Sequence, residues 1–294
     1  MITPQTPWQQ LRARFFESRT AALAFWLFVT LAVVAVAAPW IAPQNPYDLA
    51  SVSILNAELP PGSTSAAGAM HHLLGTDGAG RDVLSAILYG LRISIGVGLA
   101  SAFVALIVGT SIGLAAAHFG GLVDAVIMRI VDLQLSFPAI LVALMLLAVL
   151  GQGVDKTLLA LIVVQWAYYA RSVRGTAQVE RQKEYVEAAI GQGLPARRIM
   201  FRHVLPNCVA PLLVIVTLQT AGAITLEATM SFLGIGLPQT KPSLGLLIAN
   251  GFEYLLSNMY WISVFPGIAL ALLVASINLI GDRLRVAANP KYEE

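Results

Sequence analysis

The sequence is poor in charged residues and almost free of cysteine. Only 12% of its 294 residues are charged, whereas 57% are hydrophobic and the mean hydropathy is +0.74. A soluble domain carries about 25% charged residues and about half apolar ones. The single cysteine, Cys208, excludes an internal disulfide framework and a cysteine-based metal site. The net charge of +2 is too small to indicate a nucleic-acid partner. These deficits exclude a large soluble domain and favour a protein of the lipid bilayer.

Motifs for ATP binding and for catalysis are missing as well. The sequence has no Gly-x-x-x-x-Gly-Lys-Ser/Thr phosphate loop, and no Gly-Lys dipeptide at all. Among the four histidines, His71 and His72 are adjacent and are interpreted as turn or surface residues, and no pair has metal-ligand spacing on a helix. We therefore expect no catalytic residue, no cofactor and no metal site in this chain.

Long segments without any charged residue or histidine are what the sequence does contain. Five of them exceed the roughly 20 residues needed to cross a bilayer. A sixth is shorter, and it can span if Lys156 and Arg171 at its ends extend toward the membrane surfaces. The six windows are residues 20–47, 93–117, 133–154, 157–170, 204–226 and 254–281. They predict an all-α polytopic membrane protein with about six transmembrane helices.

The basic residues fix the predicted orientation. With the N-terminus in the cytoplasm, the segments before 20, 118–125, 171–203 and after 281 are internal. They hold 13 of the 18 Lys and Arg residues, whereas four lie on the outer side. This asymmetry agrees with the positive-inside rule, and the opposite topology would invert it.

The windows and charges divide the chain into five regions. The predicted regions are a cytoplasmic N-terminus (1–20), a first transmembrane helix (21–42), an external loop (43–91), a core of five transmembrane helices (92–281) and a cytoplasmic tail (282–294). In the external loop, Thr76 or Asp77 suits a helix cap. Val83, Ile87 and Leu91 fall on one helical face, which predicts a helix lying along the membrane surface.

Few ionisable residues lie within the predicted spans. Arg129 and Asp132 are three residues apart and can pair on one helical face. Glu227 is near the end of the fifth span, where a role at an outer gate and a helix contact are both open. No acidic pair lies mid-membrane as a proton relay requires, which argues against a proton-driven transporter. Gly109-x-x-x-Gly113 permits close helix approach.

The long internal loop, within residues 171–207, has the pattern of a helix, a break and a second helix. Glu187-Ala188-Ala189 favours a helix, Gly191 and Gly193 end it, and Pro195 suits the first turn of the next. The apolar face of such a hairpin needs a cover. Either the hairpin folds against its own bundle, or another protein covers it.

The spacing of this loop resembles the EAA loop of bacterial ABC importer permeases. The resemblance is carried by Glu187, Ala188, Ala189, Gly193, Leu205 and Pro206. Other segments resemble the C-type subunits of dipeptide, oligopeptide and nickel importers, so that the likeness covers about residues 70–290. These segments are His72–Asp77, Gly80–Ser85, Tyr89–Ser94, Glu227–Gly236, Phe265–Gly267 and Asn278–Arg285. Leu244 departs from the pattern by taking the place of a Trp often found there, and its predicted external position bears on receptor contact or gating.

The resemblance implies a type I ABC importer permease fold in the bacterial inner membrane, with the loop 43–91 in the periplasm. It implies that the inner loop couples the chain to an ATP-hydrolysing subunit. The implied partners are a second homologous permease, two ATP-binding-cassette ATPases, a periplasmic solute-binding protein and the lipid bilayer. The implied solute is a di- or oligopeptide, or a related small solute such as a nickel complex.

Overall fold

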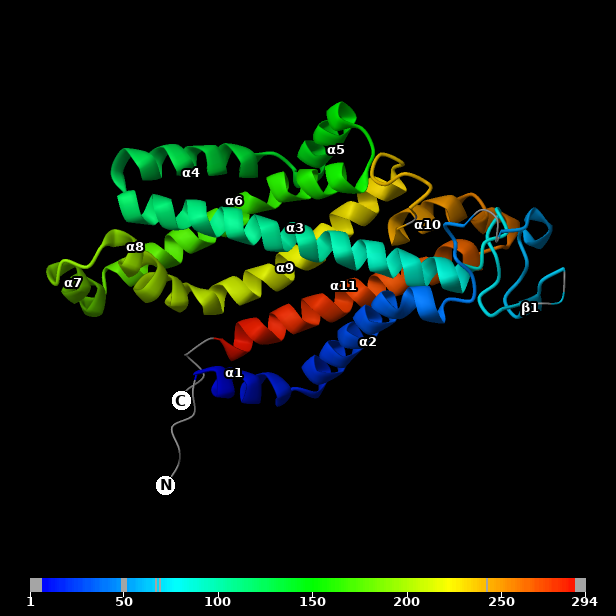
Figure 1. Cartoon of the computed structure of the whole chain (residues 1–294), viewed down its shortest axis with the longest axis horizontal. Helices are drawn as coiled ribbons and strands as arrows, with labels where there is room; N and C mark the ends of the chain where they lie inside the picture. Colours follow the sequence, from blue (N-terminus) through cyan, green and yellow to red (C-terminus); the bar gives the residue numbers. More distant parts are fainter. Residues whose placement is uncertain (1–6, 49–51, 67, 69, 242, 289–294) are drawn as a thin grey trace, which may run out of the picture.

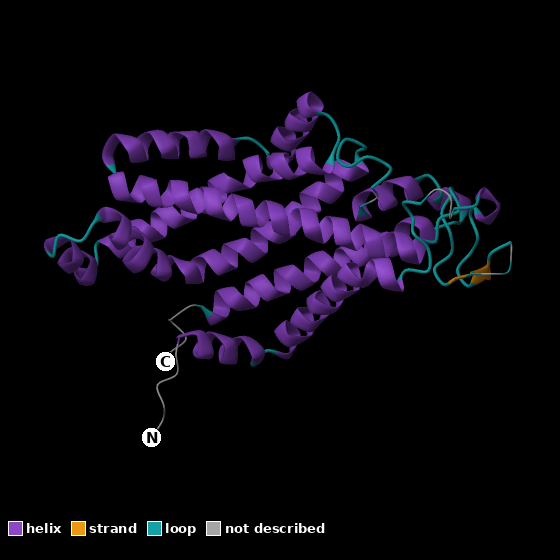
Figure 2. Cartoon of the chain, viewed as in Figure 1, coloured by secondary structure: helices purple, strands orange, loops and turns teal. Residues whose placement is uncertain are grey.

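Long helices run side by side along the molecule, as a computed structural model of the chain shows (Figures 1 and 2). The structure describes residues 7–48, 52–66, 68, 70–241 and 243–288. The α-helices are α1 (Pro7–Phe16), α2 (Arg19–Ile41), α3 (Val83–Phe119), α4 (Gly121–Ser136), α5 (Ala139–Leu150), α6 (Val154–Arg181), α7 (Glu184–Gly191), α8 (Ala196–Ile199), α9 (Leu205–Phe232), α10 (Leu244–Phe252) and α11 (Trp261–Ala287). Shorter elements are the 3-10 turns η2 (Ile54–Asn56) and η4 (Leu255–Ser257), the π-turn η3 (Met200–Val204), and the strands β1 (Ser63–Thr64) and β2 (His71–His72).

The two ends of the bundle are formed by different segments of the chain. The helices α1, α7 and α8, the turn between α3 and α4, and the last turns of α11 all lie toward one end (Figure 1). The antiparallel β1–β2 hairpin and α10 lie at the other end (Figure 1). The described parts of the four segments that the sequence assigns to the cytoplasm therefore share one end of the molecule, which we call the inner end.

Four described segments are long and apolar enough to cross a membrane: α2, α3, α11 and the continuous run from α8 through η3 to α9. The pair α4 and α5 makes a fifth if it counts as one span. The remaining predicted span lies in α6, whose 28 residues extend about 42 Å at 1.5 Å per residue. Its 14-residue apolar window is thus part of a longer helix, whose second half carries Arg171, Arg174 and Arg181.

The window 133–154 does not form one straight span. The chain bends by 91° between α4 and α5. Pro138 accounts for the break, because a proline disfavours helical backbone in the residue before it, and Phe137 is extended at φ −92°, ψ 141°. The helix α4 runs along α3, and α5 turns away from it (Figure 1).

The predicted surface helix at the end of 43–91 is wrong. Residues 83–91 are the first turns of α3, which continues without interruption to Phe119. Val83, Ile87 and Leu91 are buried in the core that contains Trp261, so this face packs against protein. The helix is capped by Asp82 rather than by Thr76 or Asp77, since its carboxylate accepts from the Ser85 amide at 2.8 Å. The predicted boundary between the external loop and the core, at residues 91/92, falls inside α3, because a single charged residue such as Arg92 does not end a helix.

The outer end is more buried than the sequence predicts. His72 is not a surface residue: it is buried, and its Nδ1 lies 3.0 Å from Oδ1 of the buried Asp82. Leu244 is also fully buried, and it contacts the position of Gly90 on α3. Leu244 therefore fills the core between α10 and α3 and does not present itself to a receptor.

The helices α3 and α6 make the most extensive contact in the bundle. Two glycines one turn apart allow the close approach, as the Gly-x-x-x-Gly spacing predicts. A Cβ at Gly109 would lie 2.4 Å from the Trp166 carbonyl oxygen, and one at Gly113 would lie 2.5 Å from that of Ala170. Both partners are backbone atoms of α6, so the helices must separate to admit a side chain.

We predict that Gly109→Ala lowers the stability of the protein by about 1–3 kcal/mol, the usual cost of overpacking a filled site. Gly96→Ala on the same helix is the matched control, because nothing lies within 4 Å of a Cβ there. It should be neutral or slightly stabilising, since alanine favours a helix over glycine. Thermal unfolding of the purified protein in detergent measures both. Equal melting temperatures for the two variants would contradict the close contact.

Candidate functional site: an inner hairpin and a cavity

The predicted hairpin of the inner loop is present, and we call residues 184–204 the inner hairpin. Its first helix is α7, which contains Glu187, Ala188 and Ala189. The chain reverses at Gly193, whose φ of +71° is in the left-handed region that favours glycine. Pro195 is extended and directly precedes α8. The hairpin then continues through η3 into α9, with Leu205 and Pro206 at the first turn of that helix.

One face of the inner hairpin is buried against the chain's own bundle. Val186, Ala189, Ile199 and Val204 are buried in a core shared with α3, α6 and α9. Burial of these four side chains fixes the hairpin to the ends of the transmembrane helices. The sequence left open whether the chain's own bundle or another protein covers the apolar face of the hairpin. For this face, the cover is the chain's own bundle.

The opposite face of the inner hairpin is open. Glu187, Ala188 and Gly193 are exposed. Two large apolar side chains, Ile190 and Phe201, are each 52% exposed on the same hairpin. Exposed basic residues accompany them, namely Arg197, Arg198 and Arg202. Apolar side chains rimmed by charges are typical of a surface for another protein.

A hydrogen-bond network at the base of the inner hairpin was not foreseen from the sequence. The Tyr185 hydroxyl donates to Glu180 Oε1 at 2.5 Å, and it accepts from Asn207 Nδ2 at 2.9 Å. Lys183 Nζ lies 2.7 Å from Glu180 Oε2. The network joins the end of α6, the start of α7 and the start of α9. Only the Glu180–Lys183 spacing could be noticed in the sequence, because Asn207 is distant in sequence and only the fold brings it next to Tyr185.

The Tyr185 hydroxyl keeps its proton in this network. Burial raises the pKa of Tyr185 to about 12, and the hydrogen bond to the Glu180 carboxylate acts in the same direction. At neutral pH the phenol is therefore a stable donor to Glu180. Its hydrogen bonds connect the three helices at this point.

Ion pairs attach α6 to its neighbours near the inner end. The Arg174 guanidinium holds Asp124 of α4 with Nε–Oδ1 at 2.9 Å and Nη2–Oδ2 at 2.5 Å. Asp132 is also paired with an arginine of α6, Arg171. The predicted pair between Arg129 and Asp132 is thus wrong, since a partner from another helix reaches the carboxylate and Arg129 is exposed.

Glu227 is fully buried and ringed by hydroxyl groups. Ser94 Oγ of α3 donates to its Oε2 at 2.9 Å, and Ser231 Oγ of its own helix donates to its Oε1 at 2.8 Å. The Ser243 hydroxyl, at the cap of α10, is a third hydrogen-bonding partner. The carboxylate therefore links three elements near the outer end. Of the two roles left open for Glu227, this geometry supports the helix contact, while a gating role stays a prediction.

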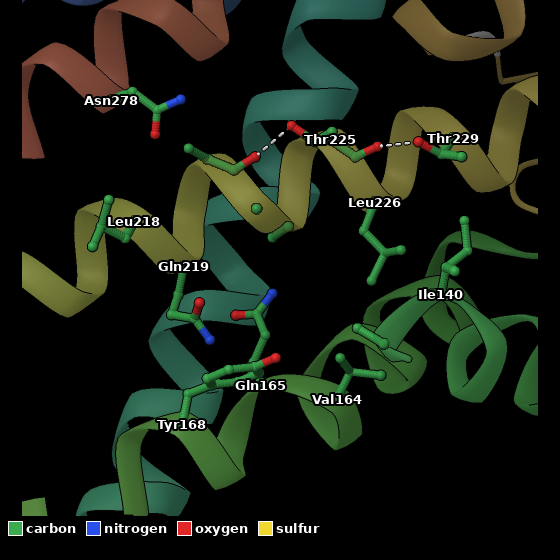
Figure 3. A pocket seen from close by; sticks show the side chains of 14 residues that line it. Ile140, Val164, Gln165, Tyr168, Leu218, Gln219, Thr225, Leu226, Thr229 and Asn278 are labelled. Carbon is green, nitrogen blue, oxygen red and sulfur yellow. Dashed lines mark hydrogen bonds between the residues drawn. The ribbon is translucent and has the colours of Figure 1, made fainter. Parts of the chain in front are cut away.

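A cavity of about 560 Å³ lies between α5, α6, α9 and α11, beside the middle of α6 and the second half of α9 (Figure 3). Its polar side chains come from α6, α9 and α11, and they are Gln165, Tyr168, Gln219, Thr225, Thr229 and Asn278. Polar groups at this depth of a membrane protein generally face the bundle interior or a water-filled space. Thr229 and Asn278 lie in segments that resemble the importer permeases, but the sequence assigned neither of them a role. It did not single out the other four, since nothing distinguishes isolated Gln, Thr or Tyr residues within an apolar window.

Two family models match the sequence. Residues 107–294 match the binding-protein-dependent transport system inner membrane component. Residues 6–61 match the N-terminal transmembrane domain of oligopeptide transport permease C.

Curated relatives match over nearly their full lengths. A dipeptide transport system permease protein of Escherichia coli strain K12 is 39% identical over 99% of this chain and 95% of its own. The corresponding protein of Haemophilus influenzae is 35% identical over 100% and 98%. A putative peptide transport system permease protein of Brucella suis is 40% identical over 95% and 90%.

A solved structure shares the fold. A chain of the MetNI methionine ABC transporter, described in inward-facing conformations, has a TM-score of 0.56 and is 18% identical. The match covers 69% of this chain and 96% of the other. At this identity the likeness concerns the fold alone, and it agrees with the type I importer permease fold that the sequence predicts.

We predict that Tyr185→Phe loosens α7 without unfolding the bundle. The variant loses the hydroxyl that joins Glu180 to Asn207, and a hydrogen bond of this kind corresponds to about a two- to tenfold change in amide-exchange protection. Hydrogen–deuterium exchange of α7 measures it. Tyr260→Phe is the control, because the exposed Tyr260 hydroxyl has no hydrogen bond within the described part of the chain. Unchanged exchange in Tyr185→Phe would show that the network does not hold the hairpin.

Proposed function

The chain belongs to the binding-protein-dependent transport system inner membrane components, and on this basis we propose that it forms half of the passage of an ATP-driven peptide importer. The family makes it a multi-pass permease of the inner membrane. One observation carries the rest of the proposal: the two helices that flank the inner hairpin, α6 and α9, also line the cavity. A force applied to the hairpin is thereby applied to the walls of the cavity.

The energy in this proposal comes from another chain. The sequence has no phosphate loop of its own, so ATP is bound and hydrolysed by separate ATPase subunits, and this chain has no catalytic role. The ATPase docks on the open face of the inner hairpin, where Glu187, Ala188 and Gly193 are exposed. Ala189 anchors the hairpin from its buried side.

Motion then passes from the hairpin to the membrane. Because Tyr185 hydrogen-bonds to both Glu180 and Asn207, a displacement of α7 moves the adjoining ends of α6 and α9 together. Leu205 and Pro206 start α9 directly after the hairpin, so no flexible linker absorbs the motion. The result is alternating exposure of the cavity to the two sides of the membrane.

The complete transporter in this proposal has five components around the bilayer. This chain pairs with a second homologous permease, each permease docks one of two ATPases, and a periplasmic solute-binding protein delivers the solute. Relatives named for dipeptide transport support peptides as the solute. The wider class of small solutes, nickel complexes included, is the alternative for the same machinery.

We predict that the assembled transporter in proteoliposomes imports a labelled peptide only with ATP, and that Glu187→Lys or Gly193→Leu abolishes most of this uptake. Glu187→Lys alters the open face of the hairpin and leaves its buried face intact, whereas Gly193→Leu also places a side chain in the left-handed backbone of the reversal and strains the hairpin locally. Membrane insertion of both variants should stay normal. ATP hydrolysis and uptake are measured together, and the variants should lose the link between the two.

Gln182→Lys is the control, because it adds positive charge beside the hairpin at an exposed position that precedes α7. It should transport normally. Normal coupled uptake by Glu187→Lys and Gly193→Leu would refute the docking role of this face. Uptake by this chain alone under a proton gradient would instead identify a secondary transporter.

A further inference from the structure

We propose that the cavity between α6 and α9 contains a hydrogen-bonding site for an amide group of the passing solute, with Gln165 as its central residue. The inference rests on the proposed function and adds to it the residues that contact the peptide bond within the membrane.

The side-chain amide of Gln165 is buried and unpaired. Gln165 is only 4% exposed, and neither its Oε1 nor its Nε2 has a hydrogen-bond partner. No other side-chain amide in the described ranges is buried with both of its polar atoms unpaired. Buried polar groups are nearly always hydrogen-bonded, and an unpaired one costs the free energy of its lost hydration. We infer that this amide hydrogen-bonds to a group that is present only while a solute passes.

Gln165 is one of the residues that line the cavity, and its two amide atoms are covered by protein atoms in this conformation, so contact with a solute requires the wall to open at this point. Figure 3 shows the amides of Gln165 and Gln219 pointing into the same space, beside the ring of Tyr168. Asn278 of α11 lines the same cavity. Three helices thus each contribute one primary amide, a group that donates and accepts hydrogen bonds at once.

Two threonines of α9 complete the polar wall. Thr225 Oγ1 donates to the Ala221 carbonyl at 2.9 Å, and Thr229 Oγ1 donates to the Thr225 carbonyl at 2.8 Å (Figure 3). Their protons are used within the helix, so their oxygens remain available as acceptors. A peptide N–H entering the cavity meets acceptors on this side.

The wall is uncharged. None of the described residues that line the cavity is acidic, basic or a histidine. Ion pairs with the charged termini or side chains of a peptide are therefore not the means of recognition here. Complementary hydrogen bonds to the C=O and N–H of a peptide bond fit the set of amides and hydroxyls, and they do not depend on the side chains that the peptide carries.

The site lies at mid-membrane depth. Gln165 is about 17 Å along α6 and Gln219 is about 21 Å along α9, counted from their first residues at 1.5 Å per residue. Both positions are near the middle of spans that cross a hydrocarbon core of about 30 Å. A solute that has left its hydration shell needs hydrogen-bond partners at this point of the passage.

Gln165→Leu tests the proposal in the assembled transporter. The variant keeps the volume of the side chain and removes both polar atoms. We expect the initial rate of peptide uptake at saturating loaded binding protein to fall about three- to tenfold. The melting temperature should be unchanged or higher, because an unpaired buried amide is removed. Ile140→Leu, an apolar change in the same wall, is the matched control and should transport normally.

An ester analogue of the peptide gives a readout that a structural role of Gln165 would not change. The wild type should import the peptide faster than the analogue in which an ester oxygen replaces the amide N–H. Gln165→Leu should import the two more equally. If Gln165→Leu does not assemble, Gln219→Leu serves as the second variant with the same expectation.

Normal uptake in these variants would overturn the proposal, as would an unchanged preference for peptide over ester. A fall in uptake that accompanies an equal loss of assembled complex would show a structural role and overturn it too. Failure of the wild-type transporter to import any peptide with ATP would refute the proposed function itself, which separates the two outcomes.

Discussion

The close contact between α3 and α6 is the constraint on which the other features depend. Gly109 and Gly113 bring the two backbones together, which positions α6 so that its arginines reach the carboxylates of α4. The same helix then continues to the network around Tyr185 at its inner end. Without a fixed α6, neither the inner hairpin nor the cavity wall would have a defined position.

Buried polar side chains occur at two levels of the bundle, and the levels differ in whether these side chains have hydrogen-bond partners. Near the outer end, both oxygens of the Glu227 carboxylate accept hydrogen bonds from serine hydroxyls, and serines of three elements surround it. At mid-depth, Gln165 has no partner at all. A satisfied buried network stabilises one arrangement of helices, whereas an unpaired buried polar group costs free energy until a partner reaches it. This difference agrees with the proposal that Gln165 contacts the solute, while the serine contacts of Glu227 support a helix contact at that level.

Much of the architecture could be predicted from the sequence, because charge-free windows indicate membrane spans and helix-breaking residues indicate where helices end. The reversal at Gly193 and the close approach at Gly109 follow from glycine alone. The partner of Asp132 could not be predicted, since a carboxylate takes the nearest cation in space and Arg171 comes from another helix. The burial of His72 and the orphan amide of Gln165 were likewise invisible, because both depend on which helices surround them.

The central claim is that the inner hairpin transmits work from a separate ATPase, and site-directed cross-linking tests it most directly. Cys208 is the only native cysteine and is buried, so single cysteines can be introduced with little background. Gln192→Cys on the inner hairpin should cross-link to the ATPase subunit in the assembled transporter. Leu256→Cys, which is 99% exposed at the outer end, should not. Cross-linking of the ATPase to position 256, or its absence at position 192, would contradict the account.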